Sequence, residues 1–136
     1  MRVAFAADDS NESVDAVLRA LRKRAEVIEL GPRSWPEMSE AVGRAVANGE
    51  VDYGVLMCWT GTGTAIAANK VPGVRAAQAA DPWIAENARR WNDANVLTMS
   101  LKRTAPDVAV ECVNAFLDIE VPDADELEHI AKLTGK

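Results

Sequence analysis

A thiol, several hydroxyls and two glycines follow one another within seven residues of this chain. Cys58, Trp59 and Thr60 come directly before the run Gly61, Thr62, Gly63 and Thr64. Glycine lets backbone N–H groups turn toward a ligand, and a helix that begins here adds partial positive charge. Such a loop can hold an anion, either a phosphate or an oxyanion formed during a reaction. It is neither a Walker loop nor a dinucleotide-binding G-x-G-x-x-G motif.

Other polar residues follow apolar runs that predict strands. Asp8 and Asp9 end the first run, and residues 100–104 follow another. Because the carboxyl ends of parallel strands meet at one edge of a sheet, these groups are expected to form one polar pocket with the Cys58 loop. The only histidine, His129, lies in the last predicted helix, so Cys–His hydrolase chemistry is not supported. Proton transfer next to a carbonyl fits better, with a base and N–H groups that hold an enolate oxygen.

The elements that must position these residues alternate along the chain. Apolar runs predict strands near residues 2–7, 25–30, 53–56, 74–79 and 95–99, and helical spacing follows each of them. A final amphipathic helix is expected over residues 123–133. This alternation predicts right-handed crossovers and a parallel sheet covered on both faces. We therefore expect one α/β, doubly wound, Rossmann-like domain over residues 1–136, with five strands whose order the pattern does not specify.

Composition excludes several classes of function. The net charge of −6 argues against a nucleic-acid partner. No stretch has the length of a transmembrane helix and no signal peptide precedes the first strand, so we expect a cytoplasmic protein without a membrane partner. The two cysteines, Cys58 and Cys112, lie in different contexts, a loop and the apolar face of a helix. Neither they nor the single histidine suggest a metal site, so no metal and no cofactor are expected.

Two stretches of the chain resemble a known family, the type B ribose-5-phosphate isomerases and the related galactose-6-phosphate isomerases. They are residues 61–77 and residues 88–97, with support from Asp8 and from Trp35-Pro36. The resemblance implies interconversion of aldose and ketose phosphates through a cis-enediol without a metal. It also implies a homodimer or tetramer with sites between subunits. The segment around Trp91, which precedes strand five at the opposite edge, would then serve the partner's site.

The resemblance also assigns roles to individual residues. Cys58 matches the base that moves the proton between C1 and C2, and Thr60 matches a hydroxyl near that proton. The loop Gly61, Thr62, Gly63 and Thr64 matches the anion hole. Asp8 matches a group that binds sugar hydroxyls, and Asn92 matches an amide that contacts substrate. Asp9, Trp91 and Lys102 are also counted among the substrate-binding residues.

The chain departs from the family pattern at several positions. Trp91 replaces the ring-opening histidine, Asp9 replaces another common histidine, and Trp59 replaces a glycine after the thiol. Phosphate is normally held by arginines after strand five and near the C-terminus. Lys102 or Arg103 keeps the first of these cations, whereas the C-terminal positions carry residues such as Asp125, Glu126 and His129. Ribose 5-phosphate is therefore not the expected substrate.

Our leading hypothesis is an aldose–ketose isomerase for another small sugar or sugar phosphate. A tetrose 4-phosphate needs no ring-opening group, because its C4 oxygen is blocked, whereas an unphosphorylated sugar suits the lost arginines. The alternative is a non-catalytic sugar-binding homologue or one subunit of a hetero-oligomeric isomerase, and a nucleotide binder ranks last. Simpler roles also stay open. Asp8 and Asp9 could cap the first helix, Cys58 could be a buried strand residue, and Trp59 and Trp91 could be core or dimer anchors.

Overall fold

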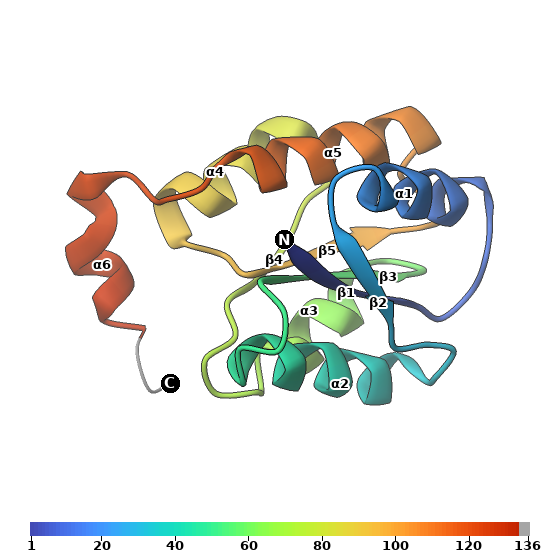
Figure 1. The fold of residues 1–136 in the computed structure, drawn as a ribbon, viewed down its shortest axis with the longest axis horizontal. Coiled ribbons are helices and arrows are strands. Elements are labelled where there is room, and N and C mark those ends of the chain that lie inside the picture. Colours follow the sequence, from blue (N-terminus) through green and yellow to red (C-terminus); the bar gives the residue numbers. More distant parts are fainter. Residues whose placement is uncertain (134–136) are drawn as a thin grey trace.

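A parallel sheet of five strands forms the centre of the molecule (Figure 1). The computed structural model describes residues 1–133. The strands are β1 (Arg2–Ala7), β2 (Glu26–Glu29), β3 (Tyr53–Cys58), β4 (Ala76–Gln78) and β5 (Val96–Ser100). The helices are α1 (Glu12–Arg22), α2 (Trp35–Ala47), α3 (Thr62–Ala68), α4 (Pro82–Asn92), α5 (Pro106–Asp118), the 3₁₀ helix η1 (Ala124–Glu126) and α6 (Leu127–Ala131). The expected fold class is confirmed.

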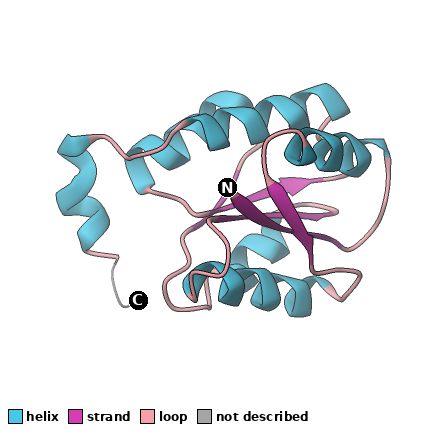
Figure 2. Ribbon diagram, in the orientation of Figure 1, coloured by secondary structure: helices cyan, strands magenta, loops and turns pink. Residues whose placement is uncertain are grey.

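Helices cover both faces of the sheet (Figure 2). α1, α4 and α5 pack on one face, and α2 and α3 pack on the other. Alternation within the strands explains this, since Val55 and Met57 belong to the first core, whereas Leu56 and Cys58 belong to the second. Cys58 therefore points to the side of α2 and α3.

The strand order is β2-β1-β3-β5-β4, all parallel. The chain moves outward from β1 to β2 with α1 on one face, and then crosses to β3 with α2 on the other face. The gap between the ends of β1 and β3 is therefore the topological switch point, where open α/β sheets bind their ligands. Asp8 and the Cys58 loop leave the sheet at this point, and the Asp8 N–H donates to the Met57 carbonyl at 3.2 Å.

Local capping explains where three of the helices begin. The side chains of Asn11, Ser34 and Asp81 each accept a hydrogen bond from a backbone N–H in the first turn of α1, α2 and α4. Proline follows within two residues of the cap in α2 and α4, where its missing N–H costs nothing. Because Asn11 caps α1, the simpler explanation of Asp8 and Asp9 as caps is wrong.

Two elements are shorter than expected. β4 covers three residues, and side-chain amides bind the backbone N–H groups where it begins. The Asn95 side chain accepts from the Arg75 N–H, and the Asn69 side chain accepts from the Ala76 N–H. The expected helix over residues 123–133 is a 3₁₀ turn followed by a short helix without a buried residue. A short helix gains most of its stability from packing, so this segment does not extend into a longer one. Within residues 1–133, no helix is long and apolar enough to cross a membrane.

Candidate active site

The loops after β1 and β3 enclose a pocket of about 420 Å³ beside Cys58. Its lining consists of Asp8, Trp35, Cys58, Trp59, Thr60, Thr62 and Gly63. The loop after β5 supports this arrangement from the far side of β3, because the Leu101 N–H donates to the Cys58 carbonyl at 2.9 Å. No lysine, arginine or histidine lines the pocket among the residues that the structure describes. The only ionisable groups of its lining are therefore the Cys58 thiol and the Asp8 carboxyl.

The Cys58 sulfur is held by the loop that follows it. The Gly61 N–H donates to the sulfur at 3.1 Å, and the Thr64 hydroxyl lies 3.4 Å from it. Burial of the sulfur disfavours the thiolate, but hydrogen bonds from Thr64 and from the backbone of the loop outweigh burial, so the pKa of Cys58 lies below the usual value of a thiol. A thiolate is the form of cysteine that can accept a proton, and the lowered pKa increases its fraction at a given pH.

A second hydroxyl lets Cys58 change protonation state without leaving a buried group unpaired. Thr64 Oγ1 donates to the Gly61 carbonyl at 3.1 Å, and Thr98 Oγ1 donates to the same carbonyl at 2.9 Å. When Cys58 ionises, the Thr64 proton can turn to the sulfur while Thr98 still satisfies the carbonyl. Unpaired buried acceptors cost about 1–3 kcal/mol, so this duplication lowers the cost of forming the thiolate.

The two glycines of the loop are required for different structural reasons. Gly61 has a φ of +79°, and a Cβ there would lie 2.9 Å from the Met99 carbonyl carbon. Only glycine suits both conditions. At Gly63 a Cβ would lie 3.1 Å from the ring of Trp35, so the missing side chain allows this indole to pack against α3 and line the pocket. The Gly61 N–H already serves the sulfur and the Thr62 N–H serves Thr60, which leaves the Gly63 N–H in the first turn of α3 for a substrate oxygen.

Thr60 and Thr62 form a small hydroxyl pair at the pocket. Their Oγ1 atoms lie 2.7 Å apart, and the Thr62 N–H donates to Thr60 Oγ1 at 3.3 Å. Gln78, at the end of β4, donates from its side-chain amide to the Thr60 carbonyl at 2.9 Å. This contact joins the edge strand to the Cys58 loop, and sequence analysis missed it because Gln78 gave no chemical signal.

Asp8 contributes a carboxyl with unused hydrogen-bonding capacity. Its Oδ1 is buried and has no hydrogen-bond partner among residues 1–133. Desolvation by burial raises the pKa of Asp8. The backbone N–H of Asp8 lowers this pKa, and the nearby charge of Asp9 raises it further. A buried acceptor that is left unpaired at a pocket is available for a ligand hydroxyl.

Asp9 and Lys102 do not line the pocket but meet at the indole of Trp59. The Trp59 Nε1–H donates to Asp9 Oδ2 at 3.2 Å, and the Lys102 ammonium lies 4.3 Å from the centroid of the ring. The backbone of Trp59 is fixed as well, because its carbonyl accepts from the Ser100 hydroxyl. The loops after β1, β3 and β5 therefore meet at this side chain.

Trp91 and Asn92 lie at the opposite edge of the sheet, as expected. They end α4, and Trp91 makes an edge-to-face contact with Trp83, with ring centroids 5.7 Å apart. Asn92 lines a separate hollow of about 340 Å³ with residues such as Arg75 and Ala77. The single chain therefore does not bring Trp91 or Asn92 to Cys58.

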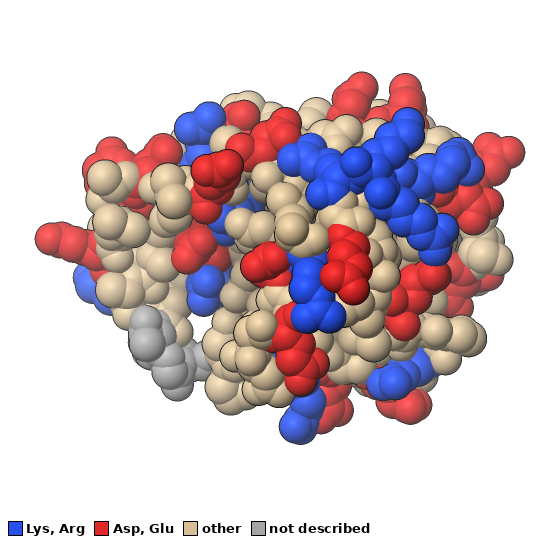
Figure 3. Space-filling model, viewed as in Figure 1, with Lys and Arg blue, Asp and Glu red and all other residues tan. Residues whose placement is uncertain are grey.

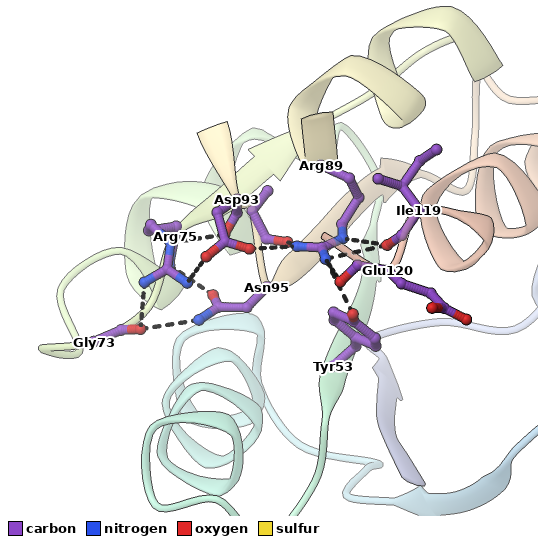
Figure 4. Close-up of polar contacts among 9 residues, drawn as sticks. Tyr53, Gly73, Arg75, Arg89, Asp93, Asn95, Ile119 and Glu120 are labelled. Carbon is purple, nitrogen blue, oxygen red and sulfur yellow. Dashed lines mark hydrogen bonds and ion pairs between the residues drawn. The ribbon is translucent and has the colours of Figure 1, made fainter. Parts of the chain in front are cut away.

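The residues next to Asn92 have a structural role. Figure 4 shows the buried Arg89 guanidinium, which donates to Asp93 Oδ1 and to the carbonyls of Ile119 and Glu120. Asp93 has a φ of 48° at the C-terminus of α4, and its Oδ2 pairs with Arg75 at 3.3 Å. Much of the motif over residues 88–97 thus fixes the turn between α4 and β5.

One group of positive charges on the surface lies away from the pocket. Figure 3 shows lysine and arginine side chains clustered over α1 on the face it displays. Arg19 and Arg22 lie in the last turn of α1, where cations complement the helix dipole, and Arg22 pairs with Glu29 at 2.7 Å. This end of α1 lies at the edge where the strands begin. The cluster therefore does not replace the cations absent from the pocket lining.

The sequence model of the Ribose/Galactose Isomerase family matches residues 3–133. The chain belongs to this family. Within the described residues, no group of three or more histidine, cysteine, aspartate or glutamate side chains could hold a metal ion. The family and the class of enzyme, an aldose–ketose isomerase, are as expected from the sequence.

Individual family members match between about three quarters and nearly all of this chain. Ribose-5-P isomerase B of Listeria innocua is 36% identical, over 87% of this chain and 84% of its own. The ribose-5-phosphate isomerase B structure from Clostridium thermocellum superimposes with a TM-score of 0.86 at 31% identity, covering 98% and 95% of the two chains. D-erythrulose-4-phosphate isomerase of Pectobacterium atrosepticum is 34% identical, over 73% of this chain and 65% of its own.

Proposed function

We propose that this isomerase acts on a short, open-chain sugar phosphate and moves a proton between C1 and C2 through a cis-enediol. The observation that carries this proposal is the Cys58 sulfur. It receives the Gly61 N–H, lies beside the Thr64 hydroxyl and has a lowered pKa in a pocket at the switch point of the sheet. A proton-abstracting base in an isomerase must line the substrate pocket and have a pKa near the working pH, and the lowered pKa of Cys58 moves it in that direction.

The proton inventory of the proposed reaction is simple. The Cys58 thiolate removes the proton from C2 of the aldose, which leaves a thiol and an enediolate. The thiol then returns the proton to C1, and the proton of the C2 hydroxyl moves to the C1 oxygen, which gives the ketose. The Gly63 N–H at the start of α3 would hold the developing oxyanion, and the unpaired Oδ1 of Asp8 would accept a substrate hydroxyl.

Two observations favour a four-carbon substrate. Trp91 stands where the family carries its ring-opening histidine, and an indole cannot transfer a proton to a ring oxygen. A tetrose 4-phosphate needs no such group, because its phosphorylated C4 oxygen cannot close a ring. One relative with 34% identity is a D-erythrulose-4-phosphate isomerase, which supports the same substrate length.

Deuterium exchange read by NMR tests the reaction and the substrate together. Purified protein is incubated in D₂O with erythrose 4-phosphate, ribose 5-phosphate and unphosphorylated erythrose. We expect deuterium at C1 or C2 of the four-carbon phosphate, loss of exchange in Cys58→Ala, and retained exchange in Cys112→Ala, which alters only the α5 core. Full exchange by folded Cys58→Ala would refute the assignment.

We further propose that two copies of the chain complete the site. α4 exposes Trp83, Ile84 and Trp91, and exposed aromatic groups are frequent at subunit interfaces. Complementation tests this arrangement, because a mixed dimer of Cys58→Ala and Trp91→Ala chains holds one site with both native residues. We expect the mixture to be more active than either variant alone, whereas additive activities would contradict a shared site.

A further inference from the structure

The turn that carries the Gly63 N–H has no side-chain cap of its own. The cap residue of α3, Gly61, lacks a side chain, whereas the cap side chains of α1, α2 and α4 accept hydrogen bonds from their first turns. A short helix gains most of its stability from packing. The direction of the Gly63 N–H therefore depends on the groups that pack against this turn.

One side chain, the indole of Trp35, packs directly on Gly63. A Cβ added to Gly63 would lie 3.1 Å from Cε3, 3.2 Å from Cζ3 and 3.3 Å from Cδ2 of Trp35, which are all atoms of the six-membered ring. Gly63 does not have the positive φ of Gly61, so its backbone conformation would accept alanine. The indole, rather than the backbone, therefore excludes a side chain at this position.

The indole is held in place from α2. Trp35 is the first residue of this helix, directly after the cap residue Ser34, and its carbonyl accepts from the Ser39 hydroxyl at 2.6 Å. One turn further on, Met38 is fully buried in the core between α2 and the sheet. The Trp35 side chain is 45% exposed and lines the same pocket as Cys58. A ring that is partly open to solvent thus joins a rigid helix to the turn beside the base.

We propose that Trp35 is a positioning residue for the isomerisation: by packing on Gly63, its indole directs the Gly63 N–H at the oxyanion of the enediolate. This inference rests on the proposed function and adds to it the residue that aims the donor. The oxyanion charge develops in the transition state, so a misdirected donor lowers kcat more than it raises KM. An indole that only binds the sugar as a wall of the pocket would act on KM instead.

Steady-state kinetics with erythrose 4-phosphate separates these two roles. Complete loss of an oxyanion donor costs about 10²–10³ in kcat, so we expect Trp35→Ala to lower kcat by about tenfold or more, with little change in KM. Gly63→Ala should also lower kcat, because its methyl group displaces the indole. In the Trp35→Ala background, however, Gly63→Ala should cause no further fall. Gly43→Ala is the matched control, since a Cβ there would lie 3.1 Å from Val71 Cγ2, away from the pocket, and kcat should not change.

Urea unfolding of the same variants tests the contact without any substrate. Alanine stabilises a helix relative to glycine, so Gly63→Ala should raise the urea midpoint in the Trp35→Ala background. The midpoint should rise less, or fall, when the indole is present. Gly43→Ala should shift the midpoint equally in both backgrounds. Equal shifts for Gly63→Ala would show that the indole does not hold this turn, and would overturn the inference.

Calorimetric titration with glycolohydroxamate tests the direction of the Gly63 N–H without turnover, because its planar pair of oxygens resembles an enediolate. We expect weaker binding in Trp35→Ala and Gly63→Ala than in the wild type and Gly43→Ala. An unchanged kcat in folded Trp35→Ala, or a raised KM at full kcat, would overturn the inference while the proposed function stands. If the wild type turns over no sugar phosphate, the proposed function fails. The titration then decides on Trp35, because equal binding by all variants, or none by the wild type, overturns its positioning role as well.

Discussion

Replacing Arg89 by methionine tests how the fold fixes the turn between α4 and β5. The Arg89 side chain is 3% exposed and pairs with Asp93 at 2.8 Å. Its guanidinium also donates to the Ala94 carbonyl and to the Tyr53 hydroxyl, and it lies 4.8 Å from the centre of the Tyr53 ring (Figure 4). Methionine fills a similar volume but donates no hydrogen bond, so the substitution removes the shared donor of several buried acceptors.

The magnitude follows from the burial of Arg89 and of the backbone carbonyls that it serves. Asp93 is about one-third exposed and keeps Arg75 as a partner, so the cost comes mainly from the carbonyls of Ala94, Ile119 and Glu120. Each buried acceptor left unpaired costs about 1–3 kcal/mol, so a total of about 3–5 kcal/mol is expected. Unfolding entropy of about 2.1 cal/mol/K per residue gives roughly 0.29 kcal/mol/K for 136 residues. The melting temperature should therefore fall by about 10–17 °C. Urea unfolding followed by circular dichroism should show a matching loss of free energy.

Arg44→Met is the matched control for this prediction. Arg44 also pairs with a residue one helical turn away, Glu40, but both side chains are more than half exposed. An exposed pair of this spacing contributes about 0.3–0.5 kcal/mol. If Arg89→Met loses no more stability than Arg44→Met, the buried network does not hold the turn, and the argument from burial is refuted.

Three further predictions concern the pocket. The rate of Cys58 alkylation by iodoacetamide should rise with pH at a midpoint below that of a free thiol, and Thr64→Val should raise this midpoint. Burial raises the pKa of Cys112 to about 11, so mass spectrometry should find Cys112 unmodified at neutral pH. Gly61→Ala should lose about 1–3 kcal/mol in urea unfolding from its positive φ alone, and an unchanged midpoint would contradict the strained turn. Asp8→Asn should be more stable than the wild type at pH 7, because the raised pKa of Asp8 means that its ionised form destabilises the fold. The stability difference between Asp8→Asn and the wild type should shrink as the pH falls below the folded-state pKa of Asp8, and it should be absent below the unfolded-state pKa. A difference that does not change with pH would contradict the raised pKa.

The elements could be predicted from the sequence because their signals are local. Asn11, Ser34 and Asp81 are capping residues that precede apolar residues at helical spacing, and the helices begin there. Strand order is different, because alternation specifies which side chains are buried but not which strands are neighbours. The place of β5 between β3 and β4 therefore came only from the structure.

Part of the candidate site could likewise be predicted from the sequence, and part of it depends on strand order. Cys58 and Asp8 could be placed at one edge because every parallel strand ends there, whatever the order. The contacts of Trp59 with Asp9 and Lys102 depend on which loops are neighbours, and single residues give no signal for that. A buried cation that serves the backbone, like Arg89, is equally hidden until its partners are known.

The arrangement of a single chain is the basis for the proposal that a second copy completes the site. Cys58, Asp8 and the α3 turn form the half that moves a proton, and they lie at the ends of β1 and β3. Asn92 and Trp91 follow a helix that runs back to the opposite edge, so no loop movement within one parallel sheet brings them to the sulfur. In the proposed two-chain site, the partner's Trp91 would therefore border the pocket without supplying a group that opens a sugar ring.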